Sequence, residues 1–285
     1  MFSCNIISLV KNFDYLEDHI LKQDFDIVAL IECWIAKYCH IPFLKGYKNE
    51  FIPSICGKSG GIVVYIRNNL CFEKIEHKCI NPEAQLEFLT IKMLKYPYII
   101  NVAYRHPKGQ IDSFLKSIED IICKKDLTLS DKSILFCGDY NLNILDDSNK
   151  NVQLYKSLLS AYGYLLFIHQ PTRVSKTSAT CIDHVFGRNM PSSSIQTKVE
   201  DILISDHKAI LIFASDAYDG NVREYTQFRN HCKSNITKFR NNLQNIDWNN
   251  HVKANQDLDN NMETFISIIS SIYLESFSNV KMLNG

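Results

Sequence analysis

The chain has 285 residues, of which 46% are hydrophobic and 22% charged, with 31 basic and 31 acidic side chains. A chain of this length can bury a large core, as one large domain or as one domain with an appendage. Its balanced charge excludes a disordered polyelectrolyte and gives no bulk attraction to nucleic acid or to an anionic membrane. Any charge that binds DNA must therefore be local.

The sequence indicates the compartment and the partners of the protein in general terms. No apolar run reaches the roughly 18 residues that a membrane-spanning helix needs, so we expect a soluble protein without a membrane partner. The ten cysteines run from Cys4 to Cys232 without a C-x-x-C pair, which favours reduced, buried thiols over disulfides or a zinc site. We therefore expect an intracellular protein, nuclear or cytoplasmic, and no obligate protein partner is evident.

Short apolar runs bounded by turn residues dominate the first 213 residues and predict buried strands. Apolar residues at helical spacing predict three helices as well. Asn68 and Asn69 indicate a hairpin between two strand-like runs, and Gly57, Gly60 and Gly61 indicate a turn into a strand. Mixed strands and helices favour an α/β fold with two sheets packed face to face and flanked by helices. The predicted strands are residues 26–31, 61–66, 86–91, 98–104, 133–137 and 209–213, and the predicted helices are residues 13–22, 111–123 and 152–162.

The composition changes after the last of these strands, because residues 221–285 are rich in asparagine. Helical patterns at residues 236–243 and 262–277 are separated by a polar stretch. We therefore divide the chain into a main domain, residues 1–215, and a helical tail or linker, residues 216–285.

Polar side chains stand where several predicted strands end. A strand end projects its side chains into a cleft at a fixed angle, although a lone acid there is usually only a solvated turn residue. Asp139 and Asn141 are two positions apart, so in extended chain they point the same way. The positions are Glu32, Tyr104, Asp139 and Asn141, Asp183, and the triplet Ser205, Asp206 and His207.

Together these residues supply what hydrolysis of a phosphate ester requires. Mg²⁺ needs one or two carboxylates, a water nucleophile needs a base, and the transition state needs donors aimed at its oxygens. His207 next to Asp206 offers such a donor beside an acid. The chain contains no G-x-S-x-G elbow, no phosphate loop and no H-E-x-x-H motif, so these other catalytic schemes do not fit.

The order and spacing of these motifs resemble the endonuclease/exonuclease/phosphatase superfamily over residues 1–213. That resemblance implies a four-layer α/β sandwich and metal-dependent phosphoester hydrolysis. Within the superfamily, the segment QPTRVSKTSATCIDHVF is most similar to the endonuclease domain of non-LTR (LINE-like) retrotransposon polyproteins. The tail then resembles their linker toward a reverse transcriptase, which is not itself present on this chain. The motifs are Asn5 in CNIISL, Glu32 in ALIECWI, SGGIVVYIRNNL, Tyr104 in AYRHP, GDYN at residues 138–141, IDHVF at residues 182–186 and SDH at residues 205–207.

The resemblance implies a role for each matching residue. Glu32, helped by Asn5, would hold the metal, which we expect to be Mg²⁺, with Mn²⁺ as the alternative, and Asp139 would activate the water. Asn141 and His207 would stabilise the transition state, with Asp183 bonded to His207. Tyr104 would contact the phosphate, Asp206 would assist the leaving oxygen or a second metal, and Arg105, Arg173 and Lys176 would contact DNA phosphates.

Three functions remain open at this stage. The first is a Mg²⁺-dependent DNA endonuclease that nicks one strand, as in non-LTR retrotransposition. The second is a phosphoesterase that acts on a small phosphorylated substrate. The third is a catalytically inactive remnant of a retroelement, since Ile7 and Cys33 depart from the family's usual residues near the metal site.

Overall fold

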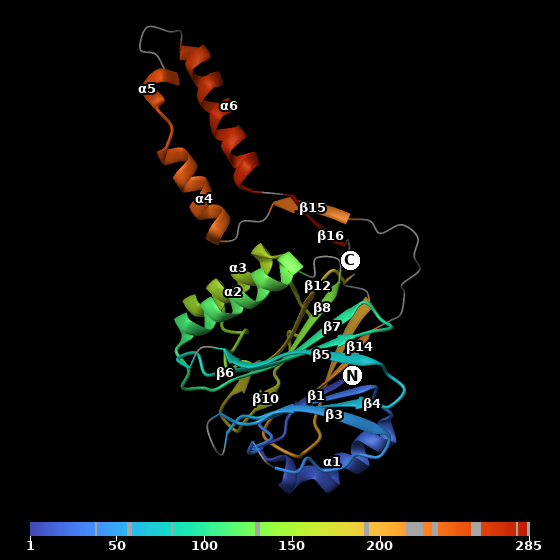
Figure 1. Cartoon of the computed structure of the whole chain (residues 1–285). Coiled ribbons are helices and arrows are strands. Elements are labelled where there is room, and N and C mark those ends of the chain that lie inside the picture. The colour runs from blue at the N-terminus through green and yellow to red at the C-terminus, as the bar shows by residue number, and fades with distance from the viewer. Residues whose placement is uncertain are drawn as a thin grey trace.

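The structure is a computed structural model of the whole chain (Figure 1). It describes every residue except 38, 56–58, 81, 129–131, 191–193, 215–224, 230–232, 252–257, 278 and 284–285. Gly57, which was predicted to lie in a turn, is outside the described residues.

Two mixed sheets of six strands form the body of the protein (Figure 1). Their arrangement, with helices on the outer faces, confirms the predicted α/β sandwich. In spatial order, the first sheet contains β13 (Ile195–Glu200), β14 (Ala209–Ala214), β1 (Phe2–Asn5), β2 (Ile27–Ile31), β4 (Ile62–Arg67) and β3 (Tyr47–Ile52). The second contains β5 (Phe72–Ile80), β6 (Leu86–Met93), β7 (Tyr98–Arg105), β8 (Ser133–Asp139), β12 (Asp183–Arg188) and β9 (Leu165–Leu166).

The helices cover the outer faces of these sheets. Helix α1 (Leu9–Gln23) lies on the first sheet, whereas α2 (Ile111–Thr128) and α3 (Lys150–Ala161) lie on the second (Figure 1). Alternate residues of β2 point in opposite directions, as strand geometry requires. Val28 and Leu30 pack in the core beneath α1, and Ile27, Ala29 and Ile31 pack in the larger core between the sheets. Both faces of β2 are therefore buried, which explains its unbroken apolar sequence.

Strand pairing brings the polar strand ends to one edge of the sandwich. β1 and β2 are parallel, with Asn5 opposite Ile31, so Glu32 follows directly beside Asn5. In the second sheet, β7 and β8 are parallel with Tyr104 opposite Asp139, and antiparallel β12 begins with Asp183 opposite Asp139. The register thus places residues from five separate motifs together.

The predicted hairpin at Asn68 and Asn69 is wrong. The strand before it, β4, pairs with β2 and β3 in the first sheet, whereas β5 after it pairs with β6 in the second. This connection therefore passes from one sheet to the other, which a local turn signal cannot reveal. The structure also has strands that we did not predict, among them β3, β5, β13 and the short hairpin of β10 (Arg173–Val174) and β11 (Ala179–Thr180).

The tail contains the predicted helices as α4 (Lys233–Gln244) and α6 (Leu258–Ser276), with the short α5 (Trp248–His251) between them. It also contains an unpredicted two-stranded sheet of β15 (Tyr225–Arg229) and β16 (Asn279–Leu283). The three helices extend away from the sandwich (Figure 1). Among the described residues, no helix is both long enough and apolar enough to cross a membrane.

Gly138 allows β8 to reach the site. Its φ is +144°, and a Cβ there would overlap the backbone carbonyl of Ala103 on β7. Because a backbone carbonyl in a paired strand cannot move aside cheaply, only glycine fits at the position before Asp139.

We predict that Gly138→Ala lowers the free energy of unfolding by more than about 3 kcal/mol, since backbone strain adds to steric overlap. Gly46→Ala is the matched control, because Gly46 also has a positive φ, +88°, but has no atom near the position of a Cβ. The control should lose only about 1–2 kcal/mol. Urea denaturation of both variants measures the difference, and equal losses would contradict the steric account.

Candidate active site

Asp139 is the most enclosed acid of the site, with 1% of its surface exposed at the end of β8. Its Oδ2 accepts a hydrogen bond of 2.9 Å from Asn5 Nδ2, and its Oδ1 accepts one of 2.9 Å from the backbone N–H of Asn141. Asn5 belongs to the first sheet and Asp139 to the second, so this hydrogen bond joins the two sheets at the site.

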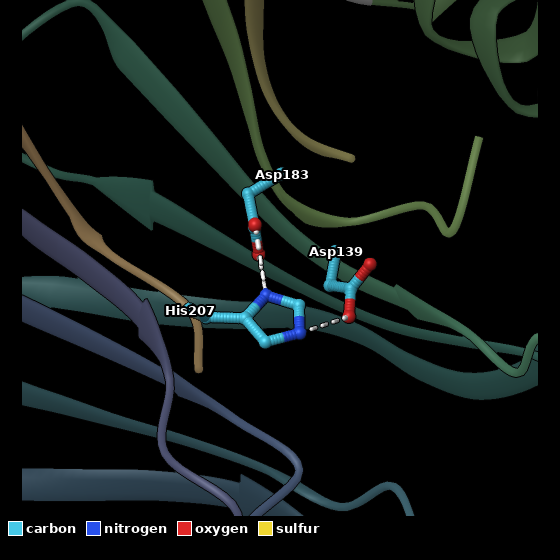
Figure 2. A group of neighbouring side chains, drawn as sticks. All are labelled: Asp139, Asp183 and His207. Carbon is cyan, nitrogen blue, oxygen red and sulfur yellow. Dashed lines mark hydrogen bonds and ion pairs between the residues drawn. The ribbon is translucent and has the colours of Figure 1, made fainter. Parts of the chain in front are cut away.

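His207 lies between two carboxylates, as Figure 2 shows. Its Nδ1 is 2.9 Å from Asp183 Oδ2 and 3.1 Å from Oδ1, and its Nε2 is 3.9 Å from Asp139 Oδ2. The three side chains are buried, and their ligand atoms lie within 4.8 Å of one another. Asp183 therefore fixes the ring, and Nε2 faces the space beside Asp139.

The charges of this cluster depend on one another. Burial, followed by the charge of Asp183, raises the pKa of Asp139 to about 7, although His207 and two hydrogen bonds act to lower it. Burial acts to lower the pKa of His207, but the charge and hydrogen bond of Asp183, followed by the charge of Asp139, raise it to about 9. At neutral pH His207 is therefore protonated, which suits a proton donor and does not suit a metal ligand.

Glu32 and Asn5 form the oxygen-rich side of the site. Glu32 is partly exposed, directly after β2, and has a positive φ of +54°. The Nδ2 of Asn5 donates to Asp139, whereas its Oδ1 accepts a long hydrogen bond of 3.3 Å from the N–H of Ile7. Carboxylate and amide oxygens suit a hard divalent cation, so these residues fit the metal that the sequence led us to expect.

Tyr104 faces the same site from β7 and is buried. Burial, followed by the charge of Glu32, raises the pKa of its hydroxyl well above the ordinary value. Among the described residues, that hydroxyl has no hydrogen-bond partner of ordinary geometry. This buried hydroxyl, which Glu32 approaches closely enough to raise its pKa through a hydrogen bond, is available to a substrate oxygen.

Arg105, which we predicted to contact DNA phosphates, is buried. Its side chain is 5% exposed, and its guanidinium donates to the backbone carbonyls of Tyr140, Asn141 and Gly109 at 3.1, 3.2 and 2.6 Å. The Nδ2 of Asn141 donates in return to the Arg105 carbonyl at 2.8 Å. This placement argues against a DNA contact by Arg105, because its buried guanidinium hydrogen-bonds the loop that carries Asn141.

The rim of the site, as we call it, consists of three exposed side chains: Arg173, Lys176 and Asp206. Both the Nε and the Nη2 of Arg173 lie near Asp206 Oδ2, at 2.7 and 2.6 Å. Arg173 also pairs through its backbone with His207, and Lys176 is exposed between the strands of the β10–β11 hairpin. This hairpin thus places both cations on the surface beside the site.

Thr172 and Ser205 support the site, and we did not predict them as site residues, although both lie inside the motifs that resemble the family. Thr172 Oγ1 accepts hydrogen bonds from the N–H groups of Ile182 and Asp183, at 3.2 and 3.1 Å. Ser205 Oγ donates to the carbonyl of Asn5 at 2.7 Å and accepts from the N–H of His207 at 3.1 Å. These hydroxyls fix the backbones on which Asp183 and His207 stand.

A family comparison matches this arrangement. The model of the Endonuclease/Exonuclease/phosphatase family matches residues 5–207, from Asn5 to His207. The chain belongs to this family. Membership agrees with the coarse prediction of a hydrolase acting on phosphodiester bonds. None of the curated proteins matches the sequence significantly.

Solved structures of the same fold include enzymes that process nucleic acid. The endonuclease domain of TRAS1, a telomere-specific non-LTR retrotransposon, has a TM-score of 0.55 and 13% identity over 76% of this chain and 98% of its own. The AP endonuclease LMAP from Leishmania major has a TM-score of 0.62 and 12% identity over 75% and 87%. An AP endonuclease from Archaeoglobus fulgidus has a TM-score of 0.58 and 13% identity over 75% and 98%. At these identities the likeness shows the fold.

We predict that Asp183→Asn lowers the pKa of His207 from about 9 toward its ordinary value of 6.5, because it removes the largest contribution that raises this pKa. Protonated His207 stabilises the fold below pH 6.5, and this stabilisation is lost as the pH rises through about 9. An NMR titration of the His207 ring, with a chelator present, measures this pKa in the parent protein and in Asp183→Asn. Asp206→Asn is the control, since the charge of exposed Asp206 contributes least. An unchanged His207 pKa in Asp183→Asn would refute the assignment.

Proposed function

We propose that the chain is a metal-dependent DNA endonuclease that hydrolyses one phosphodiester bond of a strand and leaves a 3′ hydroxyl. The observation that carries the proposal is the shared edge of the two sheets. There Asp139 contacts Asn5 and His207, Asp183 is bonded to His207, and Tyr104 lies near enough to Glu32 and Asp139 for their charges to raise its pKa.

The reaction follows from these positions. Asp139 accepts a proton from the attacking water once it is ionised, which its pKa of about 7 permits at slightly alkaline pH. The Nε2–H of protonated His207 donates to a non-bridging phosphate oxygen as negative charge grows there, and the second N–H of Asn141 can do the same. The bond from phosphorus to O3′ breaks, and a proton from water oriented by Asp206 reaches O3′, so the products are a 5′ phosphate and a 3′ hydroxyl.

Glu32 and the Asn5 oxygen would hold the divalent cation, Mg²⁺ or Mn²⁺. When bound, the cation would neutralise phosphate charge and stabilise the transition state. Tyr104 would orient the phosphate through its unpartnered hydroxyl.

DNA is the substrate that the rim favours. Lys176 and Arg173 lie on an exposed hairpin beside His207, where an extended polyanion could reach them, whereas a small phosphate ester would need only the enclosed acids and amides. The similarity of fold to retrotransposon and AP endonucleases supports the same choice.

We predict that the purified chain nicks supercoiled plasmid in Mg²⁺ or Mn²⁺ and does not do so in chelator. Asp139→Ala and His207→Ala should each lower the rate by at least about 100-fold, because each removes a group that transfers or donates a proton to the reacting atoms. The controls are Asp112→Ala and His169→Ala, which remove an exposed acid and an exposed histidine outside the site.

Activity that survives both site variants would contradict the proposal and indicate a contaminant. Hydrolysis of small phosphate esters without nicking would identify the alternative phosphoesterase. A folded protein that binds metal but turns over neither substrate would identify the inactive remnant.

We predict that Lys176→Ala weakens DNA binding and reduces the slope of log affinity against log salt by about one, as the loss of one phosphate contact requires. Arg105→Lys should leave this slope unchanged and lower the turnover rate, since Arg105 holds the Asn141 loop from within. Fluorescence anisotropy of a labelled duplex at several salt concentrations measures both. A smaller slope in Arg105→Lys would restore Arg105 as a phosphate contact.

A further inference from the structure

Glu87 on β6 is a buried acid that the reaction above does not use. Its side chain is 1% exposed, yet no cation pairs with it among the described residues. Within the described part of the chain, its carboxylate accepts backbone hydrogen bonds from Ile55 N–H to Oε1 at 3.0 Å and from Gly61 N–H to Oε2 at 2.5 Å. Each carboxylate oxygen of Glu87 therefore binds the backbone of the segment before or at the start of β4.

The turn that Glu87 holds supports the segment that carries Glu32. The carbonyl of Gly61 accepts from the N–H of Cys33 at 3.0 Å, and the carbonyl of Gly60 accepts from the N–H of Trp34 at 2.9 Å. One residue further along, the N–H of Ser54 donates to the carbonyl of Ile35 at 2.9 Å. Residues 33–35 are thus bonded to two backbone segments, and Glu87 joins these segments to each other.

This connection matters because the backbone around Glu32 is strained. Glu32 and Trp34 have φ values of +54° and +55°, in the left-handed region that residues other than glycine disfavour. Such conformations persist only where surrounding contacts impose them. Gly60 and Gly61 also have positive φ, and a Cβ at Gly60 would overlap the Glu87 carboxylate, so the turn is built closely around this acid.

Glu87 also lies near the site itself. It stands directly opposite Tyr104 in the pairing of β6 with β7, and Tyr104 neighbours Glu32. Burial, which raises the pKa of Glu87 to about 7, is opposed by the two N–H donors. The charge of Glu32 also acts to raise the pKa of Glu87, so the two carboxylates lie near each other.

We infer that Glu87 is a positioning residue that fixes the Gly60–Gly61 turn and, through it, the direction in which Glu32 presents its carboxylate to a divalent cation. The inference rests on the proposed function for the identity of that cation. Glu87, in the second sheet, would then help to set the metal affinity of Glu32, which follows a strand of the first sheet.

The informative variant is Glu87→Gln, which keeps the size but turns an NH₂ group toward one of the two backbone N–H groups. Thr90→Val is the matched control. Thr90 is equally buried on β6, and its hydroxyl donates to Asn101 Oδ1 at 2.9 Å, away from the turn. Glu32→Gln serves as the reference for direct loss of a metal ligand.

Two measurements on the full chain test the inference. Hydrogen exchange of the amides of Cys33, Trp34 and Gly61 should accelerate at least 10-fold in Glu87→Gln and remain unchanged in Thr90→Val. Titration with Mn²⁺ alone, followed by electron paramagnetic resonance, should show a Kd raised about 10- to 100-fold in Glu87→Gln, the usual effect of removing a residue that orients a metal ligand. In Thr90→Val the Kd should match that of the parent.

Unchanged exchange in Glu87→Gln would overturn the inference, and so would faster exchange with an unchanged Kd. If the parent protein binds no Mn²⁺, the proposed function fails while the exchange measurement still judges the link from Glu87 to residues 33–34. If Glu87→Gln does not fold, Glu87→Asp replaces it. Its carboxylate is too short to reach both N–H groups, so it should change exchange and Kd in the same directions.

Discussion

The hydrogen bond from Asn5 to Asp139 is the interaction on which the site depends, because it joins the two sheets where their polar strand ends meet. An acid with 1% exposure is costly to ionise, and the pKa of about 7 reflects that cost. Since this pKa lies above the ordinary 3.8, ionisation destabilises the fold as the pH rises through 7. Protonated His207 and the two N–H donors offset part of that loss. The carboxylate that the proposed mechanism uses as a base is therefore kept buried at the expense of stability.

Much of this site could be predicted from sequence for a topological reason. Strand ends can be recognised locally, from apolar runs that stop at a polar residue, and parallel pairing of β1 with β2 and of β7 with β8 brings the ends to one edge. The pairing of Asp183 with His207 was anticipated through the resemblance to a family. The buried sandwich was predictable for the same reason, since β2 and β4 are apolar on both faces.

The sequence could not predict how the chain passes from one sheet to the other, or which distant segments Arg105 and Glu87 contact. Asn68 and Asn69 carry a local hairpin signal, but the following strand belongs to the other sheet. The local sequence does not reveal which sheet that strand joins. Arg105 was predicted to contact DNA phosphates as one of the cations that a protein without net charge would need, yet its guanidinium donates to the carbonyls of Tyr140 and Asn141. Glu87 lies inside an apolar strand, where its sequence context says nothing of the distant turn that it holds.

Backbone strain connects these observations. Glu32 and Asn141 both have positive φ, and each lies at a strand end that carries a functional side chain. Each such residue costs about 1–3 kcal/mol, so neither conformation persists without contacts that impose it. Arg105 donates to the carbonyl of Asn141, and the Gly60–Gly61 turn, which the buried Glu87 holds, accepts from the N–H groups of Cys33 and Trp34 directly after Glu32. Two buried ionisable side chains, Arg105 and Glu87, thus hold the strained segments that carry Asn141 and Glu32, the residues to which the proposed mechanism gives a role.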